Sequence, residues 1–195
     1  MKYRVLAVFL PAILLSAIAT LSPLPVRAGE SGLFEDPKNT LTAAIGTNDP
    51  GRVKFFLKRG DSPDGRDRDD RPALVLAAMS GDPLIVKMLL DAHAQGRAAD
   101  ADGNTALHWA AKRGNTDVLL LLLDAHAPID AQNRQGATPL MLAAGAGQTG
   151  TLRLLLQERA DPRVMDYTGH DALDWAEDNR HSGAAKMLRQ AGVSH

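Results

Sequence analysis

The sequence predicts an all-α fold, a solenoid in which short helix-turn-helix units stack side by side. Three observations predict it: a motif that recurs at a fixed period, an apolar segment that follows each copy, and turn residues between the two. The motif reads RPALVLAA at residues 71–78, NTALHWAA at 104–111, ATPLMLAA at 137–144 and HDALDWAE at 170–177, with a weaker copy, KNTLTAAI, at 38–45. Successive copies begin 33 residues apart.

The second half of each unit repeats with the same period. It reads VKFFLKRG from Val53, VKMLLDAH from Val86, VLLLLLDAH from Val118 and LRLLLQERA from Leu152. Turn residues separate the halves: Asn-Asp-Pro at 48–50, Gly-Asp-Pro at 81–83, Gly-Asn at 114–115 and Gly-Gln at 147–148. Each half is only about two or three helical turns long. Neither helix can bury its apolar face alone, so adjacent units must stack.

Residues that share one position in every unit predict the core. One leucine per unit should form a continuous apolar row, and one alanine per unit should let neighbouring helices approach closely: Leu41, Leu74, Leu107, Leu140 and Leu173, and Ala77, Ala110, Ala143 and Ala176. Thr105 and Thr138 suit helix N-caps, and Pro139 suits a first turn, where its missing N–H is no loss. We expect Trp109 and Trp175 to fill the core.

The period and the motifs resemble those of the ankyrin repeat family, which has a 33-residue unit with a T-P-L-H-x-A signature. The best copies begin at Thr105 and Thr138, and the loop sequences DGNT at 102–105 and QGAT at 135–138 also match. The resemblance covers residues 38–193, with units near 38–66, 71–99, 104–132, 137–165 and 170–193. It implies paired antiparallel helices, an outward β-hairpin finger per unit, no cofactor, and a non-enzymatic protein-binding function.

Some positions depart from the family pattern. Where the family has Gly after the second helix, this chain has Gly60, His93, His126 and Arg159, so the non-glycine residues must take a left-handed backbone or reshape the turn. Asp70 stands where Gly is expected, which predicts an irregular first finger. The last unit carries charged residues that suit a terminal capping unit with a hydrated outer face: Asp171, Asp174, Glu177, Lys186 and Arg189.

The resemblance also implies which residues meet a partner. In the family these lie at the fingertips and at the exposed end of each first helix. The matching positions here are Arg68, Asp69, Arg71, Asp102, Asn104, Lys112, Arg113, Arg134, Gln135, Tyr167 and His170. Their mixed charge, with several Arg and a Tyr, is compatible with a protein interface.

Residues 1–28 have the pattern of a signal peptide. Lys2 and Arg4 precede an uncharged run at residues 5–21, and Ala28 ends a sequence that a signal peptidase reads, so we expect cleavage after Ala28. Residues 29–37 would then be a linker, and the mature protein would be periplasmic or secreted. The alternative is a scaffold tethered to the inner membrane by an uncleaved segment. It is disfavoured because prolines interrupt a span that needs about 20 apolar residues.

The composition limits the class of partner and the cellular compartment that the sequence favours. The 195-residue chain has 22 Lys and Arg against 23 Asp and Glu, and no Cys. Removing residues 1–28 takes three cations and no acid, which leaves 19 against 23. A mildly acidic protein binds nucleic acid poorly, and the absence of Cys and of Asn-x-Ser/Thr sites favours a bacterial periplasm. We therefore expect a monomer that binds a periplasmic or envelope protein, with no nucleic acid and no stable membrane insertion after cleavage.

A small hydrolytic or metal-dependent enzyme built around His170 is the alternative from another class. Asp171 and Asp174 could lie near the imidazole, but no nucleophile or oxyanion motif accompanies them. His93 and His126 would lie about 10 Å apart in stacked units, too far to share one zinc ion. The acidic run at residues 61–70 lacks the Gly and Glu that an EF-hand loop requires. His108 stands at the signature histidine of the family, which implies a hydrogen bond between loops.

Overall fold

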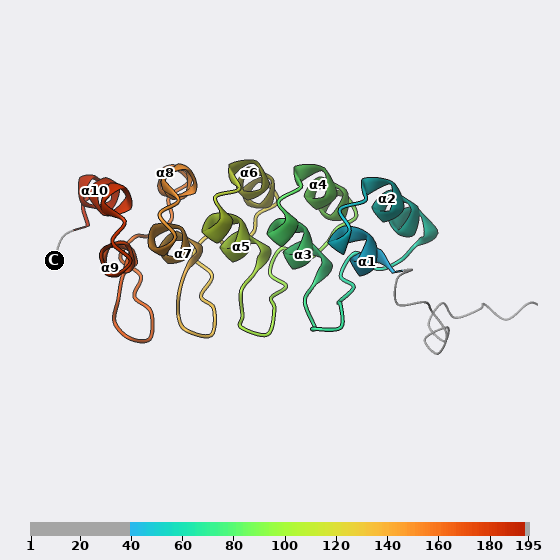
Figure 1. Ribbon diagram of the computed structural model, residues 1–195, viewed down its shortest axis with the longest axis horizontal. Helices are drawn as coiled ribbons and strands as arrows, with labels where there is room; N and C mark the ends of the chain where they lie inside the picture. The colour runs from blue at the N-terminus through green and yellow to red at the C-terminus, as the bar shows by residue number, and fades with distance from the viewer. Residues whose placement is uncertain (1–39, 194–195) are drawn as a thin grey trace, which may run out of the picture. The chain divides into compact units, whose positions relative to one another are not determined.

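The computed structural model describes residues 40–193, and these form five antiparallel helix pairs, which confirms the all-α repeat fold. The pairs are α1 (Leu41–Gly46) with α2 (Pro50–Arg59), α3 (Ala73–Ser80) with α4 (Pro83–Asp91), α5 (Ala106–Arg113) with α6 (Thr116–Asp124), α7 (Pro139–Gly145) with α8 (Thr149–Gln157), and α9 (Ala172–Asp178) with α10 (Ser182–Gln190). The first helices form one layer and the second helices another, and loops project from the layer of first helices (Figure 1).

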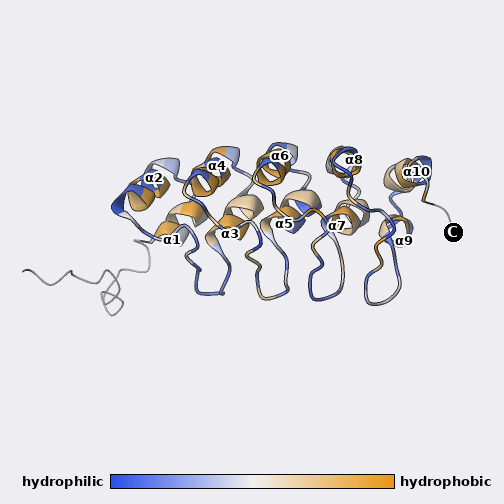
Figure 2. Cartoon of the chain, turned by 180° about the vertical axis from the view of Figure 1, so that it is seen from behind, coloured by the Kyte–Doolittle hydropathy of each residue, from blue (hydrophilic) through white to orange (hydrophobic). Residues whose placement is uncertain are grey.

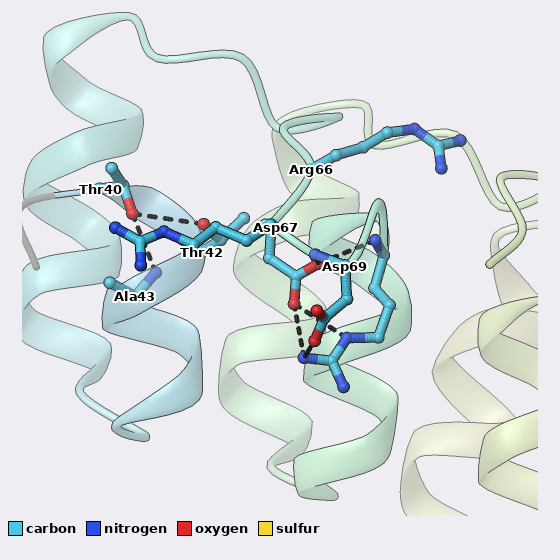
Figure 3. Close-up of a pocket in the computed structure, with 8 residues that line it drawn as sticks. Thr40, Thr42, Ala43, Arg66, Asp67 and Asp69 are labelled. Atoms are coloured by element: carbon cyan, nitrogen blue, oxygen red, sulfur yellow. Dashed lines mark hydrogen bonds and ion pairs between the residues drawn. The ribbon is translucent and has the colours of Figure 1, made fainter. Parts of the chain in front are cut away.

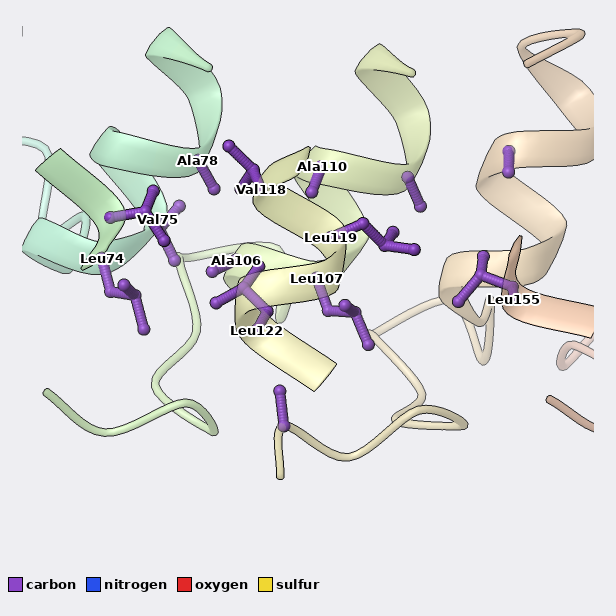
Figure 4. Close-up of a cluster of buried hydrophobic side chains, with 14 of the residues drawn as sticks. Leu74, Val75, Ala78, Ala106, Leu107, Ala110, Val118, Leu119, Leu122 and Leu155 are labelled. Carbon is purple, nitrogen blue, oxygen red and sulfur yellow. The ribbon is translucent and has the colours of Figure 1, made fainter. Parts of the chain in front are cut away.

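The core runs along the stack between the two layers. Every member of the predicted leucine row is at most 5% exposed, and the four predicted alanines are fully buried. Figure 2 shows the hydrophobic residues gathered on the helices and the hydrophilic residues on the projecting loops. Figure 4 shows how Leu107 from α5 lies with Leu119 and Leu122 from α6 inside this core. Both predicted rows are confirmed.

Polar residues fix where the helices begin. The Thr138 hydroxyl accepts the backbone N–H of Met141 at 3.3 Å, and Pro139 occupies the first turn of α7. The second helices α2 and α4 begin in a related way, with a capping aspartate followed by proline. Asp82, for example, accepts the N–H of Leu84 at 2.8 Å. These caps satisfy N–H groups that have no partner inside their helix.

The turns after the second helices keep the left-handed backbone despite their non-glycine residues. The φ angles are 66° at His93, 59° at His126 and 67° at Arg159, against 95° at Gly60. In each turn the next residue donates its N–H back to the helix, as Ala94 does to the Leu89 carbonyl oxygen at 2.9 Å. That bond closes the helix end and requires the left-handed residue. Of the two outcomes that the sequence left open, the left-handed turn is the one formed.

The expected signal peptide at 1–28 and the linker at 29–37 lie outside the described residues. Within residues 40–193, no helix combines the length and the apolar character needed to cross a membrane.

Leu107→Ala tests the stacking. The side chain is fully buried in the middle unit, so we expect the substitution to lower the free energy of unfolding by about 2–5 kcal/mol. Leu120→Ala on α6 is the matched control, because that leucine is 42% exposed, and we expect a change within about 0.5 kcal/mol. Urea unfolding followed by circular dichroism measures both, and equal effects at the two positions would contradict the buried leucine row.

Candidate functional site

Four loops project between the helix pairs, and one side chain closes each of them. We call them the first to fourth fingers: residues 65–72, 98–105, 131–138 and 164–171. The closing residues share one repeat position, and their Oδ1 atoms accept the backbone N–H groups two and four residues on: Asp67, Asp100, Asn133 and Asp166. Two backbone bonds in each finger act beside these side-chain bonds, and isolated β-bridges are found only at Arg66–Pro72 and Ala99–Thr105 in the described residues.

Two tryptophans tie their fingers to the helices. Trp109 of α5 donates its indole N–H to Asp100 Oδ2 at 2.8 Å, and Trp175 of α9 donates to Asp166 Oδ2 at 2.9 Å. Both rings are only partly buried. Both rings pack against the core, so the prediction that they fill it is confirmed only in part: each indole also spans the corner between a first helix and the finger before it, where its polar N–H finds a partner.

The other two fingers use their closing residue differently. In the third finger, Leu142 stands where tryptophan would, and Asn133 Nδ2 donates instead to Asn104 Oδ1 at 2.8 Å. In the first finger, Arg71 Nε donates to Asp67 Oδ2 at 2.8 Å. The closing residue is therefore an aspartate in the fingers where it accepts an indole or guanidinium N–H. It is an asparagine in the third finger, where it donates to another side chain.

The Asp166 carboxylate is strongly held in its ionised form. Burial raises its pKa, but hydrogen bonds from the Thr168 hydroxyl, the Trp175 indole and the backbone N–H groups of His170 and Thr168 outweigh that effect. Together they lower the pKa of Asp166 from 3.8 to about 2. The fourth finger is thus closed by a carboxylate that stays charged at any physiological pH.

The first finger is regular, and the prediction that it is irregular is wrong. Asp67 N donates to the Arg71 carbonyl oxygen at 3.0 Å and Asp70 N to the Asp67 carbonyl oxygen at 3.1 Å, which matches the pattern of the second finger. Asp70 takes the left-handed backbone, with φ of 59°, that Gly103 has at the same position. Aspartate tolerates this region better than most residues.

Neighbouring fingers differ in how they are joined. Arg134 N donates to the Asp102 carbonyl oxygen and Tyr167 N to the Gln135 carbonyl oxygen, both at 3.0 Å, so backbone bonds link the second, third and fourth fingers. Glycine permits this approach, because a Cβ at Gly103 would lie 2.9 Å from Arg134 N.

Between the first and second fingers, Asp70 occupies the glycine position, and Ala101 N has no hydrogen-bond partner among residues 40–193. A side-chain bond joins this pair instead, from Arg66 Nη1 to the Ala99 carbonyl oxygen at 3.2 Å. The first finger is thus the least firmly joined to its neighbour.

The predicted partner-facing residues lie along the fingers and at the end of α5. They are distributed as Arg68, Asp69 and Arg71 in the first finger, Asp102 and Asn104 in the second, Arg134 and Gln135 in the third, Tyr167 and His170 in the fourth, and Lys112 and Arg113 in α5. The structure brings the finger residues of neighbouring units side by side but places Lys112 and Arg113 at the opposite end of the first helix from its finger. Tyr167 is the most exposed large hydrophobic residue described, at 73%.

Some of these residues are used inside the fold. Arg71 Nη2 pairs with Asp67 at 2.7 Å and with Asp69 at 2.8 Å. These bonds raise the pKa of Arg71 and, against the opposing effect of burial, lower the pKa of Asp67. Figure 3 shows these pairs beside the groove between the start of α1 and the first finger. The charge of Arg71 is therefore neutralised within its own finger.

Other predicted cations form no ion pair in the described part of the chain. Lys112 Nζ lies 5.3 Å and the Arg113 guanidinium carbon 5.9 Å from the centre of the Trp109 ring. Neither forms an ion pair within residues 40–193, and the same holds for the exposed Arg134. These charges are available to a binding partner.

A family model described as ankyrin repeats in three copies matches residues 41–133 and 120–195. The chain belongs to the ankyrin repeat family. A comparison with curated proteins finds no match. Ankyrin repeats generally mediate protein–protein interactions, and the family is typically non-enzymatic.

His108 joins successive ankyrin repeats. It is fully buried in α5, with Nδ1 2.9 Å from the Thr105 hydroxyl and Nε2 3.0 Å from the Ala137 carbonyl oxygen of the next finger. Burial lowers the pKa of His108, so the ring is neutral and Nε2–H donates. The hydrogen bond between loops that the family resemblance implied is confirmed.

The residues around His170 serve the fourth finger of the ankyrin array. The Thr168 hydroxyl donates to Asp166 at 2.6 Å, so its oxygen accepts from His170 Nδ1–H at 2.9 Å. A hydroxyl whose proton already bonds to a carboxylate is not activated by the imidazole. Asp171 caps α9 by accepting the N–H of Leu173 at 2.7 Å. Residues 40–193 contain no group of three acidic or histidine side chains placed to hold a metal ion.

Asp166→Asn tests the bond between the fourth finger and α9. The amide keeps an oxygen for the backbone N–H groups but turns an N–H toward the Trp175 indole, so we expect the free energy of unfolding to fall by about 1–3 kcal/mol at neutral pH. Because the pKa of Asp166 is lowered from 3.8 to about 2, the carboxylate stabilises the fold above pH 3.8 and loses that effect as the pH falls through about 2. The difference between wild type and variant should shrink over this range.

Urea unfolding at a series of pH values measures it. Asp102→Asn is the control, because the exposed Asp102 side chain has no partner in the described residues, and its effect should stay within about 0.5 kcal/mol. An Asp166→Asn difference that is the same at pH 7 and at pH 2 would contradict the role of the ionised carboxylate.

Proposed function

We propose that this ankyrin repeat protein is an exported, non-enzymatic scaffold that binds a periplasmic or envelope protein through its fingers and the ends of its first helices. The observation that carries the proposal is that the fingers close on themselves while exposed charges in the third finger and at the end of α5 form no ion pair among the described residues. Lys112, Arg113 and Arg134 have no carboxylate partner within residues 40–193. A charge with no internal role gains most from a partner of opposite sign.

The construction of the fingers also supports binding on this side. Side chains satisfy much of the finger backbone, and backbone bonds link Asp102 with Arg134 and Gln135 with Tyr167 across neighbouring fingers. A surface that is already ordered loses little conformational entropy when a partner binds. Loops held on a rigid scaffold are a common place for recognition.

Charge reversal tests the binding face. The variant carries Lys112→Glu, Arg113→Glu and Arg134→Glu, and the control carries the same change on the exposed outer helices, Lys54→Glu, Lys58→Glu and Arg153→Glu. The full-length chain with a C-terminal tag is expressed through its own export route, crosslinked in cells and captured, and bound proteins are identified by mass spectrometry. We expect a protein bound by wild type and control to be lost from the first variant by at least about tenfold, which corresponds to 1.4 kcal/mol.

Equal capture by all three chains would contradict binding through this face. Loss with both variants would indicate attraction by net charge alone. Circular dichroism of each purified variant checks that the repeat fold is kept.

Export is tested at the N-terminus. If residues 1–28 are a cleaved signal peptide, N-terminal sequencing of the protein from the cell envelope should give Gly29 as the first residue. An intact Met1 in the membrane fraction would support the tethered scaffold instead.

A further inference from the structure

The two tryptophans of this chain form the same structural unit twice. Trp109 and Trp175 share a repeat position, and each donates its indole N–H to an aspartate nine residues earlier, at 2.8 and 2.9 Å. Each aspartate also closes its finger through Oδ1. We call these the Trp109 module and the Trp175 module, each being the tryptophan, its aspartate and the residues three and four positions after the tryptophan, at or just after the end of the helix.

The two modules carry opposite charges at their helix ends. Lys112 and Arg113 follow Trp109, whereas Asp178 and Asn179 occupy the same two positions after Trp175. All four residues are exposed. Lys112 and Arg113 contact the Trp109 ring, as described above. The two modules therefore share the hydrogen bond between tryptophan and aspartate. The side chains that follow the tryptophan are cationic in the Trp109 module, whereas the Trp175 module has an acidic and a neutral side chain.

The surroundings strengthen this contrast. The Trp175 module lines a groove together with residues of the third and fourth fingers. No Lys or Arg side chain lines this groove. Its charged groups are the carboxylates of Asp166 and Asp178, and Asp178 has no hydrogen-bond or ion-pair partner in the described part of the chain. A negative groove with an aromatic wall suits a cationic group. At the Trp109 ring, by contrast, the contacting charges are cationic: Lys112 and Arg113 lie over it and form no ion pair within residues 40–193, and Asp100 already accepts the indole N–H.

The Trp175 ring is held in place by the preceding repeat. A Cβ at Gly145 of α7 would lie 2.8 Å from Trp175 Cε3, so the ring rests against the glycine backbone. At Gly46, which has the same repeat position in α1, a Cβ would meet nothing within 4 Å. The aromatic wall of the groove is thus positioned before any ligand arrives.

We propose that the two modules read opposite charges on one partner segment, with a carboxylate bound at the Trp109 module and a cationic Lys or Arg side chain at the Trp175 module. The proposal rests on the protein-binding function proposed above and specifies the chemistry of the partner. The modules are two repeats apart, about 20 Å at the usual spacing of packed helices. An extended segment spans that distance with about six residues.

The chain offers a direct measurement, because it contains only two tryptophans. The full-length protein with ¹⁵N-labelled tryptophan gives two indole N–H signals, which Trp109→Phe assigns. At low salt it is titrated with acetyl-Ala-Arg-Ala-amide and with acetyl-Ala-Glu-Ala-amide. The neutral controls have citrulline in place of Arg and Gln in place of Glu. We expect the Arg peptide to shift the Trp175 signal only, the Glu peptide to shift the Trp109 signal only, and the neutral peptides to shift neither.

Exchanging the helix ends gives the decisive variants. Lys112→Asp with Arg113→Asn gives the Trp109 module the two residues of the Trp175 module. Asp178→Lys with Asn179→Arg gives the Trp175 module those of the Trp109 module. With both exchanges in one chain, the Arg peptide should shift the Trp109 signal and the Glu peptide the Trp175 signal. Lys54→Asp with Lys58→Asn on α2 is a control that changes the net charge as much as the first exchange, and it should leave the wild-type responses in place.

Three results would overturn the proposal: no shift with either charged peptide, both peptides shifting the same signal, or responses that the exchange leaves unchanged. Its failure is distinguishable from failure of the proposed function. If capture is lost in the charge-reversed variant while the indole signals do not discriminate the peptides, the binding face stands and charge reading by the modules falls. If the indole signals discriminate the peptides and no protein is captured, charge reading by the modules is supported and the proposed binding function is contradicted.

Discussion

The shortness of its helices makes every unit of this protein depend on its neighbours. The helices of the described region have six to ten residues, a length at which an isolated helix is marginal in water. They are stable because each pair covers the apolar face of the next. The fully buried alanines at one repeat position let first helices approach closely, and the leucine row fills the space between them. Stability therefore comes from the interfaces between units rather than from any unit alone.

The same constraint shapes the fingers. A loop that projects into water has little apolar surface to bury, so its conformation must come from hydrogen bonds. Asp100 and Asp166 supply them twice, through Oδ1 to the finger backbone and through Oδ2 to a tryptophan on the following helix. One carboxylate thus closes a finger and fixes its angle to the helix layer. Asp100 and Asp166 therefore order the fingers, which are part of the surface proposed to meet a partner.

The 33-residue period made much of this predictable. It places the same residue type at the same point of every unit, so Leu107, Ala110 and Thr138 could be assigned to core and cap from their position alone. The tryptophans could not, because an aromatic residue on a short helix indicates the core unless its polar partner is recognised. The signal was present nonetheless: an aspartate stands nine residues before each tryptophan, whereas Asn133 stands nine before Leu142.

Two other residues show where sequence reasoning reaches its limit. A glycine is expected at Asp70, which predicts a disturbed finger, yet the bonds inside a finger leave room for a Cβ, and only the bond to the next finger requires glycine. The family pattern places Arg71 on the partner surface, but Asp67 and Asp69 neutralise it. In the run RDRDDR several pairings are equally plausible from sequence, and only geometry selects one.

These two residues together argue for where binding is concentrated. The Cβ of Asp70 separates the first finger from the backbone bonds that join the other three, and internal ion pairs neutralise its Arg66 and Arg71. The third to fifth units differ in that their fingers are joined by backbone bonds, whereas unpaired charge is found in both places: Arg68 in the first finger, and Lys112 and Asp178 farther along, form no ion pair within residues 40–193. Rigidity lowers the entropic cost of binding, and an unpaired charge gives up no existing ion pair to a partner. Only the stretch between α5 and α9 combines the two effects, so the strongest contacts belong there.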